Sequence, residues 1–133
     1  MALFATHVDV LAHTVPAEPD YTADELRSFK SQGTALIPTL SLWTIVVSNP
    51  AISEQLVRTG VKQLETFSAN GGPVLFGTDV GFTKLYNTTL EFELMHRALS
   101  ATQVLASLTA NGATPRRSAA THPVKTEFLK PCA

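Results

Sequence analysis

The chain has 133 residues, 44% of them hydrophobic and 16% charged, a composition typical of a single globular domain that excludes a chain disordered throughout. Ten basic and eleven acidic residues give a formal net charge of -1, so no excess of positive charge favours nucleic acid or an anionic membrane as a partner. The single cysteine excludes an internal disulfide, and no segment has the roughly 20 consecutive apolar residues that span a bilayer. We therefore expect a soluble, cytoplasmic protein.

The first strand is predicted over residues 8–14, where β-prone apolar residues lead to a polar, ligand-capable histidine. Two prolines that follow closely exclude regular structure directly after it. Thr22 and Glu25 have the spacing of a capping box, so a helix is expected to begin there and to end at Gly33.

A second strand is predicted over residues 34–40, and it should end near Pro38, which has no backbone N–H to give to a ladder. The next stretch, residues 41–48, contains Trp43 and an apolar run. It is too apolar for a free loop, so we expect it to cover one end of the core.

A long amphipathic helix is predicted over residues 50–69, with Asn49 as its N-cap and Gly60 as a weak point in its middle. A glycine-rich turn follows, and the apolar run over residues 73–80 predicts a buried third strand. Asp79 lies at the carboxyl end of that strand, where parallel α/β folds place ligands and catalytic groups. The alternative is an aspartate that only caps the next turn.

Two further helices complete the predicted series. Thr88 and Glu91 have the spacing of a capping box, which predicts a helix from there to about Leu99. Ser100 and Gln103 repeat that spacing and predict a final helix that ends near the next glycine.

The predicted order is strand, helix, strand, helix, strand, helix, helix, and such alternation favours parallel strands joined by right-handed crossovers. The sequence therefore predicts an α/β fold with about three parallel strands and covering helices. Residues 1–112 are assigned to this domain, and residues 113–133, which lack hydrophobic periodicity, to an irregular C-terminal tail.

Residues 8–14, 33–40 and 74–81, in this order, resemble the last three barrel strands of the amidohydrolase superfamily, and in particular of its imidazolonepropionase-like and prolidase-like branch. Residues 90–111 resemble the helical segment that follows the last strand in that branch. The resemblance implies that the fold is a partial (β/α)8 TIM-barrel segment, with substrate at the carboxyl ends of its strands.

The same resemblance implies a metal-dependent hydrolase of an amide, ester or lactone bond. His13 would match the sixth-strand histidine that binds the metal, and Asp79 the eighth-strand aspartate that contacts the metal and takes the proton of the attacking water. The metal would be a divalent cation, zinc in the first place, because such an ion lowers the pKa of bound water toward 7.

Several family features are missing from this chain. Members of the superfamily carry a His-x-His pair on the first strand, a Lys or Glu on the fourth and a His on the fifth, and none of these is present. A whole barrel needs about 250 residues, so the chain would be a truncated form with strands six to eight. A third metal ligand would have to come from His7, His96, Glu18 or another subunit.

Three aromatic residues, Trp43, Phe82 and Tyr86, are candidates to line an apolar pocket for a small-molecule substrate, although core packing is the other use of such side chains. The strand edges of an incomplete barrel predict a homo-oligomer. The competing hypothesis is a structural or binding fragment without metal chemistry, with at most a weak promiscuous hydrolase activity.

Overall fold

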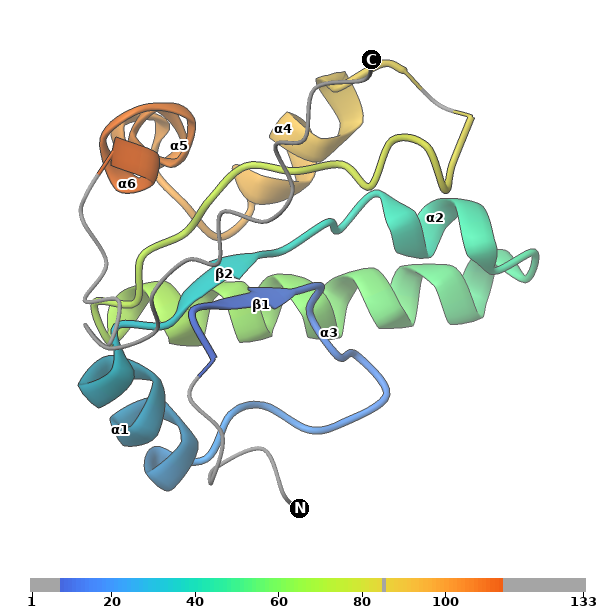
Figure 1. The fold of residues 1–133 in the computed structure, drawn as a ribbon. Helices are drawn as coiled ribbons and strands as arrows, with labels where there is room; N and C mark the ends of the chain where they lie inside the picture. The colour runs from blue at the N-terminus through green and yellow to red at the C-terminus, as the bar shows by residue number, and fades with distance from the viewer. Residues whose placement is uncertain (1–7, 85, 114–133) are drawn as a thin grey trace, which may run out of the picture.

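The computed structural model describes residues 8–84 and 86–113, and in this range it contains two strands and six helices (Figure 1). In chain order they are β1 (Val10–Ala12), α1 (Ala23–Gln32), β2 (Ala35–Ile37), α2 (Leu42–Val46), α3 (Pro50–Ala69), α4 (Thr89–Met95), α5 (Ala101–Leu108) and α6 (Ala110–Ala113). The predicted tail lies outside the described residues except for Ala113, which belongs to α6.

Local sequence signals set the starts of three helices. At α1 the Glu25 N–H donates to Thr22 Oγ1 (3.3 Å) and the Thr22 N–H donates to Glu25 Oε2 (2.7 Å), which is the predicted capping box. Ser100 and Gln103 form the same box at α5. At α3 the side chain of Asn49 accepts two N–H groups of the first turn. All three predicted starts are confirmed.

Strands β1 and β2 run parallel and side by side, with Val10 opposite Ala35 and Ala12 opposite Ile37. An extended segment, residues 73–77, lies along the other side of β2 and runs in the same direction (Figure 1). Both polar groups of the Leu36 backbone bond to it, because the Leu36 N–H donates to the Pro73 carbonyl (3.0 Å) and the Leu75 N–H donates to the Leu36 carbonyl (2.8 Å).

The prediction of a third strand over residues 73–80 is wrong, because the pairing stops at the single bridge between Leu36 and Val74. In a parallel ladder every second residue of β2 donates toward this side, and the residue after Leu36 that would do so is Pro38, which has no N–H. The ladder therefore ends where the proline interrupts it.

The prediction of a partial TIM-barrel segment is also wrong. The described part of the chain forms a two-stranded parallel sheet with six helices, and no barrel is evident in it. Where a barrel would place its next strand, helices close the edge of residues 73–77: the Phe76 N–H donates to the Ser107 carbonyl (3.3 Å), and Asn111 Nδ2 donates to the Val74 carbonyl (2.9 Å).

The core lies between the strands, α3, and the helices α4 and α5. Its ten buried residues are Leu36, Leu40, Val57, Leu64, Phe67, Val74, Leu94, Met95, Leu99 and Val104. Stacking of Phe76 on Phe92, with ring centroids 4.6 Å apart, joins the extended segment to α4. Helix α4 ends at Met95 rather than near Leu99. Among the residues that the structure describes, no helix is long and apolar enough to cross a membrane.

Candidate functional site

Backbone strain is concentrated at the carboxyl ends of the three parallel segments. Within residues 8–84 and 86–113, only three residues other than glycine have a positive φ: His13 (72°), Thr39 (47°) and Asp79 (56°). His13 directly follows β1, and Thr39 and Asp79 lie two residues beyond β2 and beyond residues 73–77. Such conformations cost about 1–3 kcal/mol each and concentrate at functional sites. We therefore take this edge, named here the carboxyl edge, as the candidate site.

The His13 ring is held by Thr39. Its Nδ1 lies 2.6 Å from Thr39 Oγ1, and the Thr39 hydroxyl donates to the Pro38 carbonyl at 2.9 Å. When the hydroxyl hydrogen is used in that bond, the Thr39 oxygen accepts from the ring, which corresponds to the tautomer with its hydrogen on Nδ1. Nε2 then carries the lone pair that a metal ligand or a general base needs.

The left-handed turn at His13 also redirects the backbone of the next residue. The N–H groups of His13 and Thr14 donate to the Ile37 and Pro38 carbonyls at 2.8 and 3.1 Å. Two consecutive N–H groups thus point to β2, whereas a regular strand alternates its N–H groups between its two sides. This arrangement fixes both ends of the His13 residue against β2.

Trp43, predicted to line a substrate pocket, lies next to this turn. Its indole Nε1 donates to Thr14 Oγ1 at 3.3 Å, and the half-buried ring packs against the hydrophobic core. Phe82 and Tyr86 are different, because 73% and 82% of their surface is exposed. Their rings are accessible to a ligand, and they do not enclose a cavity with Trp43.

Helix α3 holds the loop after His13 through Gln63, whose side chain is 1% exposed. Gln63 Oε1 accepts the Val15 N–H (2.9 Å), and Nε2 donates to the carbonyls of Val15, Glu18 and Pro19 at 3.0–3.2 Å. Thr66, one turn further along α3, donates to Asp20 Oδ2 at 2.6 Å. The loop that contains Glu18 is therefore anchored to the helix by polar bonds.

Gly60 allows α3 to approach the carboxyl edge closely. A Cβ at this position would lie 2.8 Å from Thr14 Oγ1 and 3.0 Å from Leu40 Cδ2. Gly77 has the same role in residues 73–77, where a Cβ would lie 2.5 Å from Ile37 Cγ2. Gly60 weakens α3 because glycine has a low helix propensity, but its missing side chain leaves room for Thr14 and Leu40.

Glu91 is fully buried and binds the turn that follows Thr39. Its Oε1 accepts the Leu40 N–H (2.9 Å) and its Oε2 the Ser41 N–H (2.7 Å). Burial raises the pKa of Glu91, while hydrogen bonds from Ser41 and Leu40 act in the opposite direction. The prediction that Glu91 closes a capping box at α4 is wrong: Thr88 makes no side-chain cap bond, and Asn87 Oδ1 accepts the Thr89 N–H instead (2.8 Å).

Asp79 closes a tight turn, since its backbone carbonyl accepts the N–H groups of Phe82 (3.2 Å) and Thr83 (3.3 Å). Its carboxylate and the His13 ring belong to the same edge of the sheet but not to neighbouring segments. β2 lies between them, so their backbones are roughly 10 Å apart, which is two strand spacings.

The other predicted ligand sources do not join these two residues. Glu18 and His96 are exposed, Glu18 in the loop held by Gln63 and His96 at the end of α4, and His7 lies outside the described residues. Among residues 8–84 and 86–113, no group of three His, Cys, Asp or Glu side chains could hold a metal ion.

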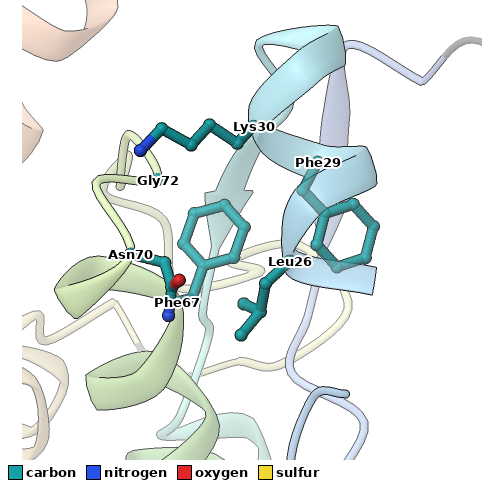
Figure 2. Close-up of a pocket in the computed structure, with 6 residues that line it drawn as sticks. All are labelled: Leu26, Phe29, Lys30, Phe67, Asn70 and Gly72. Atoms are coloured by element: carbon teal, nitrogen blue, oxygen red, sulfur yellow. The ribbon is translucent and has the colours of Figure 1, made fainter. Parts of the chain in front are cut away.

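A shallow hollow lies at the opposite, amino-terminal end of the sheet, between α1 and the end of α3 (Figure 2). It is lined by Leu26, Phe29, Lys30, Phe67, Asn70 and Gly72. Phe67 comes close to Gly72, where a Cβ would lie 2.2 Å from its ring. The lining is mostly apolar, so it offers packing surface rather than chemistry.

Comparisons with protein-family models, with curated proteins and with solved structures find no match to this chain. The carboxyl edge is therefore the feature of the molecule that bears on its function.

Three residues of the site were not predicted from the sequence: Thr39, Gln63 and Glu91. Gln63 had a usable signal, because it is a polar residue on the buried face of an amphipathic helix. Glu91 and Thr39 had none that a single sequence shows. The Thr-x-x-Glu spacing fits a helix cap equally well, and the left-handed backbone of a threonine after proline has no sequence signature.

Proposed function

We propose that the chain is a hydrolase of an amide, ester or lactone bond, with its site at the carboxyl edge, His13 as a ligand of a divalent metal ion and Asp79 as the general base. The observation that supports the proposal is the orientation of His13 by Thr39. Metal-binding histidines commonly donate one ring N–H to an oxygen and bind the ion with the other nitrogen, and the Nδ1 contact of 2.6 Å matches that arrangement.

The residues present fit a divalent ion in kind. An imidazole nitrogen and a carboxylate are the donor types that zinc takes, and a catalytic zinc site adds a third protein donor and a water. A second copy of the chain is the source we propose for the third donor. When bound, the ion would lower the pKa of its water toward 7.

The chain's own residues would carry the remaining steps. Asp79 accepts the proton of the attacking water; it lies two residues beyond residues 73–77, at a φ of 56°. The half-buried Trp43 and the exposed rings of Phe82 and Tyr86 would contact the apolar part of a small substrate.

The test uses purified protein, a panel of chromogenic ester, lactone and amide substrates, and metal analysis before and after chelation. Asp79→Asn should lower kcat at least a hundredfold without unfolding the protein, because asparagine tolerates a positive φ. His13→Ala should lower both metal content and turnover. Asp24→Asn, at an exposed aspartate of α1, is the matched control and should have no effect.

Hydrolysis that persists after chelation, with Asp79→Asn and His13→Ala within a few-fold of the starting protein, would contradict this mechanism. That result would favour the competing hypothesis of a binding fragment with weak promiscuous activity.

A further inference from the structure

We infer that Glu91 is the positioning residue of the carboxyl edge: by binding the backbone after Thr39 it holds the Thr39 hydroxyl where His13 needs it. The functional interpretation rests on the proposed hydrolase site, but the positioning of His13 can be measured without any activity.

The first step is the contact between α4 and the turn after β2. Glu91 is 0% exposed, and its two carboxylate oxygens accept the N–H groups of two consecutive residues, Leu40 and Ser41, at 2.9 and 2.7 Å. A carboxylate that takes two adjacent N–H groups fixes the orientation of the peptide unit between them. These two bonds therefore tie the backbone of residues 40–41 to α4.

The second step is the strained residue immediately before. Thr39 has a φ of 47°, although a β-branched side chain is disfavoured in this region. Such a conformation persists only where the surroundings over-determine it. The bonds of Glu91 to Leu40 and Ser41 supply that constraint on the carboxyl side of Thr39.

The third step leads to the ring. Thr39 Oγ1 lies 2.6 Å from His13 Nδ1, so the rotamer and backbone of Thr39 decide which ring nitrogen carries the hydrogen. If the turn relaxes, Thr39 Oγ1 moves away from His13 Nδ1. Nε2 is then no longer held as the ring nitrogen with the free lone pair. Glu91 thus acts on His13 through Thr39, although nothing places it in contact with the ring.

The Glu91 carboxylate has a desolvation cost as well as a structural use. A buried carboxylate must be desolvated, and in the folded protein burial raises the pKa of Glu91 despite the hydrogen bonds it accepts. An apolar residue would avoid this penalty but would leave the N–H groups of Leu40 and Ser41 without their acceptor. A carboxylate is, however, well suited to hold two adjacent backbone N–H groups.

The experiment compares the wild-type protein with Glu91→Gln, in which the amide can accept from only one of the two N–H groups. Nitrogen-15 NMR of the His13 ring, recorded in chelator-treated protein, reports which ring nitrogen carries the hydrogen. The wild type should show a protonated Nδ1 and an unprotonated Nε2. Glu91→Gln should move both signals toward the average of the two tautomers, and Glu93→Gln, at an exposed residue of α4, should leave them unchanged.

If Glu91→Gln does not fold, Glu91→Asp keeps the charge but is too short to reach both N–H groups, and hydrogen exchange at Leu40 and Ser41 in the wild type measures the same bonds directly. His13 signals that do not respond to a folded Glu91 variant, or unprotected Leu40 and Ser41 amides in the wild type, would overturn the inference. If the His13 signals respond to Glu91→Gln but the wild type hydrolyses no substrate, the proposed function is wrong and Glu91 is still the positioning residue. Where hydrolysis is present, Glu91→Gln should lower it about tenfold through kcat.

Discussion

The carboxyl end and the middle of helix α3 contact the rest of the fold in different ways. Near its carboxyl terminus Phe67 packs against Tyr21 and Phe29, with ring centroids 6.1 and 6.0 Å apart, and this aromatic end has only packing to offer. Near its middle Gly60 and Gln63 meet the carboxyl edge, where the contacts are hydrogen bonds and a glycine leaves room for a threonine hydroxyl. One helix thus supports both the aromatic end, where packing provides stability, and the carboxyl edge, where hydrogen bonds fix the geometry.

The difference shows which substitutions the aromatic end and the carboxyl edge tolerate. Large apolar side chains fill the aromatic end, so removal of atoms there leaves a cavity. The carboxyl edge holds three strained backbones and a buried carboxylate, features that lower stability and are kept for the positions they give to side chains. Truncation at the aromatic end should therefore lower stability, whereas a substitution that relieves backbone strain at the carboxyl edge should raise it.

The largest effect is expected at the aromatic end. Phe67 is 1% exposed, and Phe67→Ala should lower the free energy of unfolding by about 3–5 kcal/mol, measured by urea denaturation. Leu105→Ala, at a side chain on α5 that is 61% exposed, is the control and should change stability by less than about 0.5 kcal/mol. A loss below about 1 kcal/mol for Phe67→Ala would show that this end is not the main packing centre.

A second test at the same end uses pH. Burial, with Asp20 and Glu25 as further causes, raises the pKa of Tyr21 from 10.0 to about 12. The unfolded chain therefore releases this proton from about pH 10, whereas the folded protein keeps it until about pH 12, so the contribution to stability is complete below pH 10 and is lost as the pH rises to 12. The wild type should lose up to about 2 kcal/mol over this window relative to Tyr21→Phe, which has no such group.

Chemical denaturation of both proteins at several pH values between about 9 and 12 measures this difference. Parallel stability curves for the two proteins would mean that the Tyr21 hydroxyl is as well solvated in the folded protein as in the unfolded chain.

The helix starts could be predicted from the sequence because a cap is local. Thr22 with Glu25, and Ser100 with Gln103, interact over three residues, and nothing distant competes with them. The absence of a regular third strand could not be predicted from the local sequence. It depends on Pro38, just beyond β2, which has no N–H to give to residues 73–77. It also depends on Ser107 and Asn111, which lie more than 30 residues from the Phe76 and Val74 groups that they bond.

The carboxyl edge divides in the same way. His13 and Asp79 were predicted because each ends a run of β-prone residues, and the structure places both at one edge. Glu91 was misassigned because its partners, the Leu40 and Ser41 N–H groups, lie about 50 residues away and satisfy the carboxylate better than the local cap. Local patterns thus fix which residues are available, and distant backbone groups decide how they are used.

A third prediction tests the close approach at the middle of α3. Gly60→Ala gains about 1 kcal/mol of helix propensity, but the new Cβ would lie 2.8 Å from Thr14 Oγ1. We expect a net loss of about 1–2 kcal/mol, measured by thermal or urea denaturation. Gly112→Ala is the matched control, because nothing lies within 4 Å of its Cβ, and it should be neutral or slightly stabilising. Stabilisation by Gly60→Ala would mean that the carboxyl edge can move away from α3.

A smaller effect of opposite sign is expected at Asp79. Asp79→Gly removes the penalty of a positive φ of 56°, so it should stabilise the protein by up to about 1 kcal/mol while it abolishes the proposed hydrolysis. Asp79→Asn separates the two effects, since it keeps the side-chain shape and should leave stability nearly unchanged. Destabilisation by Asp79→Gly would indicate that the carboxylate has a structural role that outweighs the strain.

The smallest effect on stability, and the last test, concerns the outer edge of β1. The register of the sheet directs the backbone groups of Asp9, Leu11 and His13 toward β2, so the N–H and C=O groups of Val10 and Ala12 point away from it. An edge of this kind can pair with a second copy in the antiparallel sense about a two-fold axis, which would place the carboxyl edge of one copy beside the amino-terminal end of the other. We expect a weak homodimer, detected by sedimentation at micromolar concentration, that Ala12→Pro abolishes, because proline removes an outward N–H and should cost less than about 1 kcal/mol of folding stability. A monodisperse wild-type monomer, or a dimer that Ala12→Pro leaves intact, would contradict pairing along β1. The contrast between the aromatic end and the carboxyl edge would then be a property of a single chain.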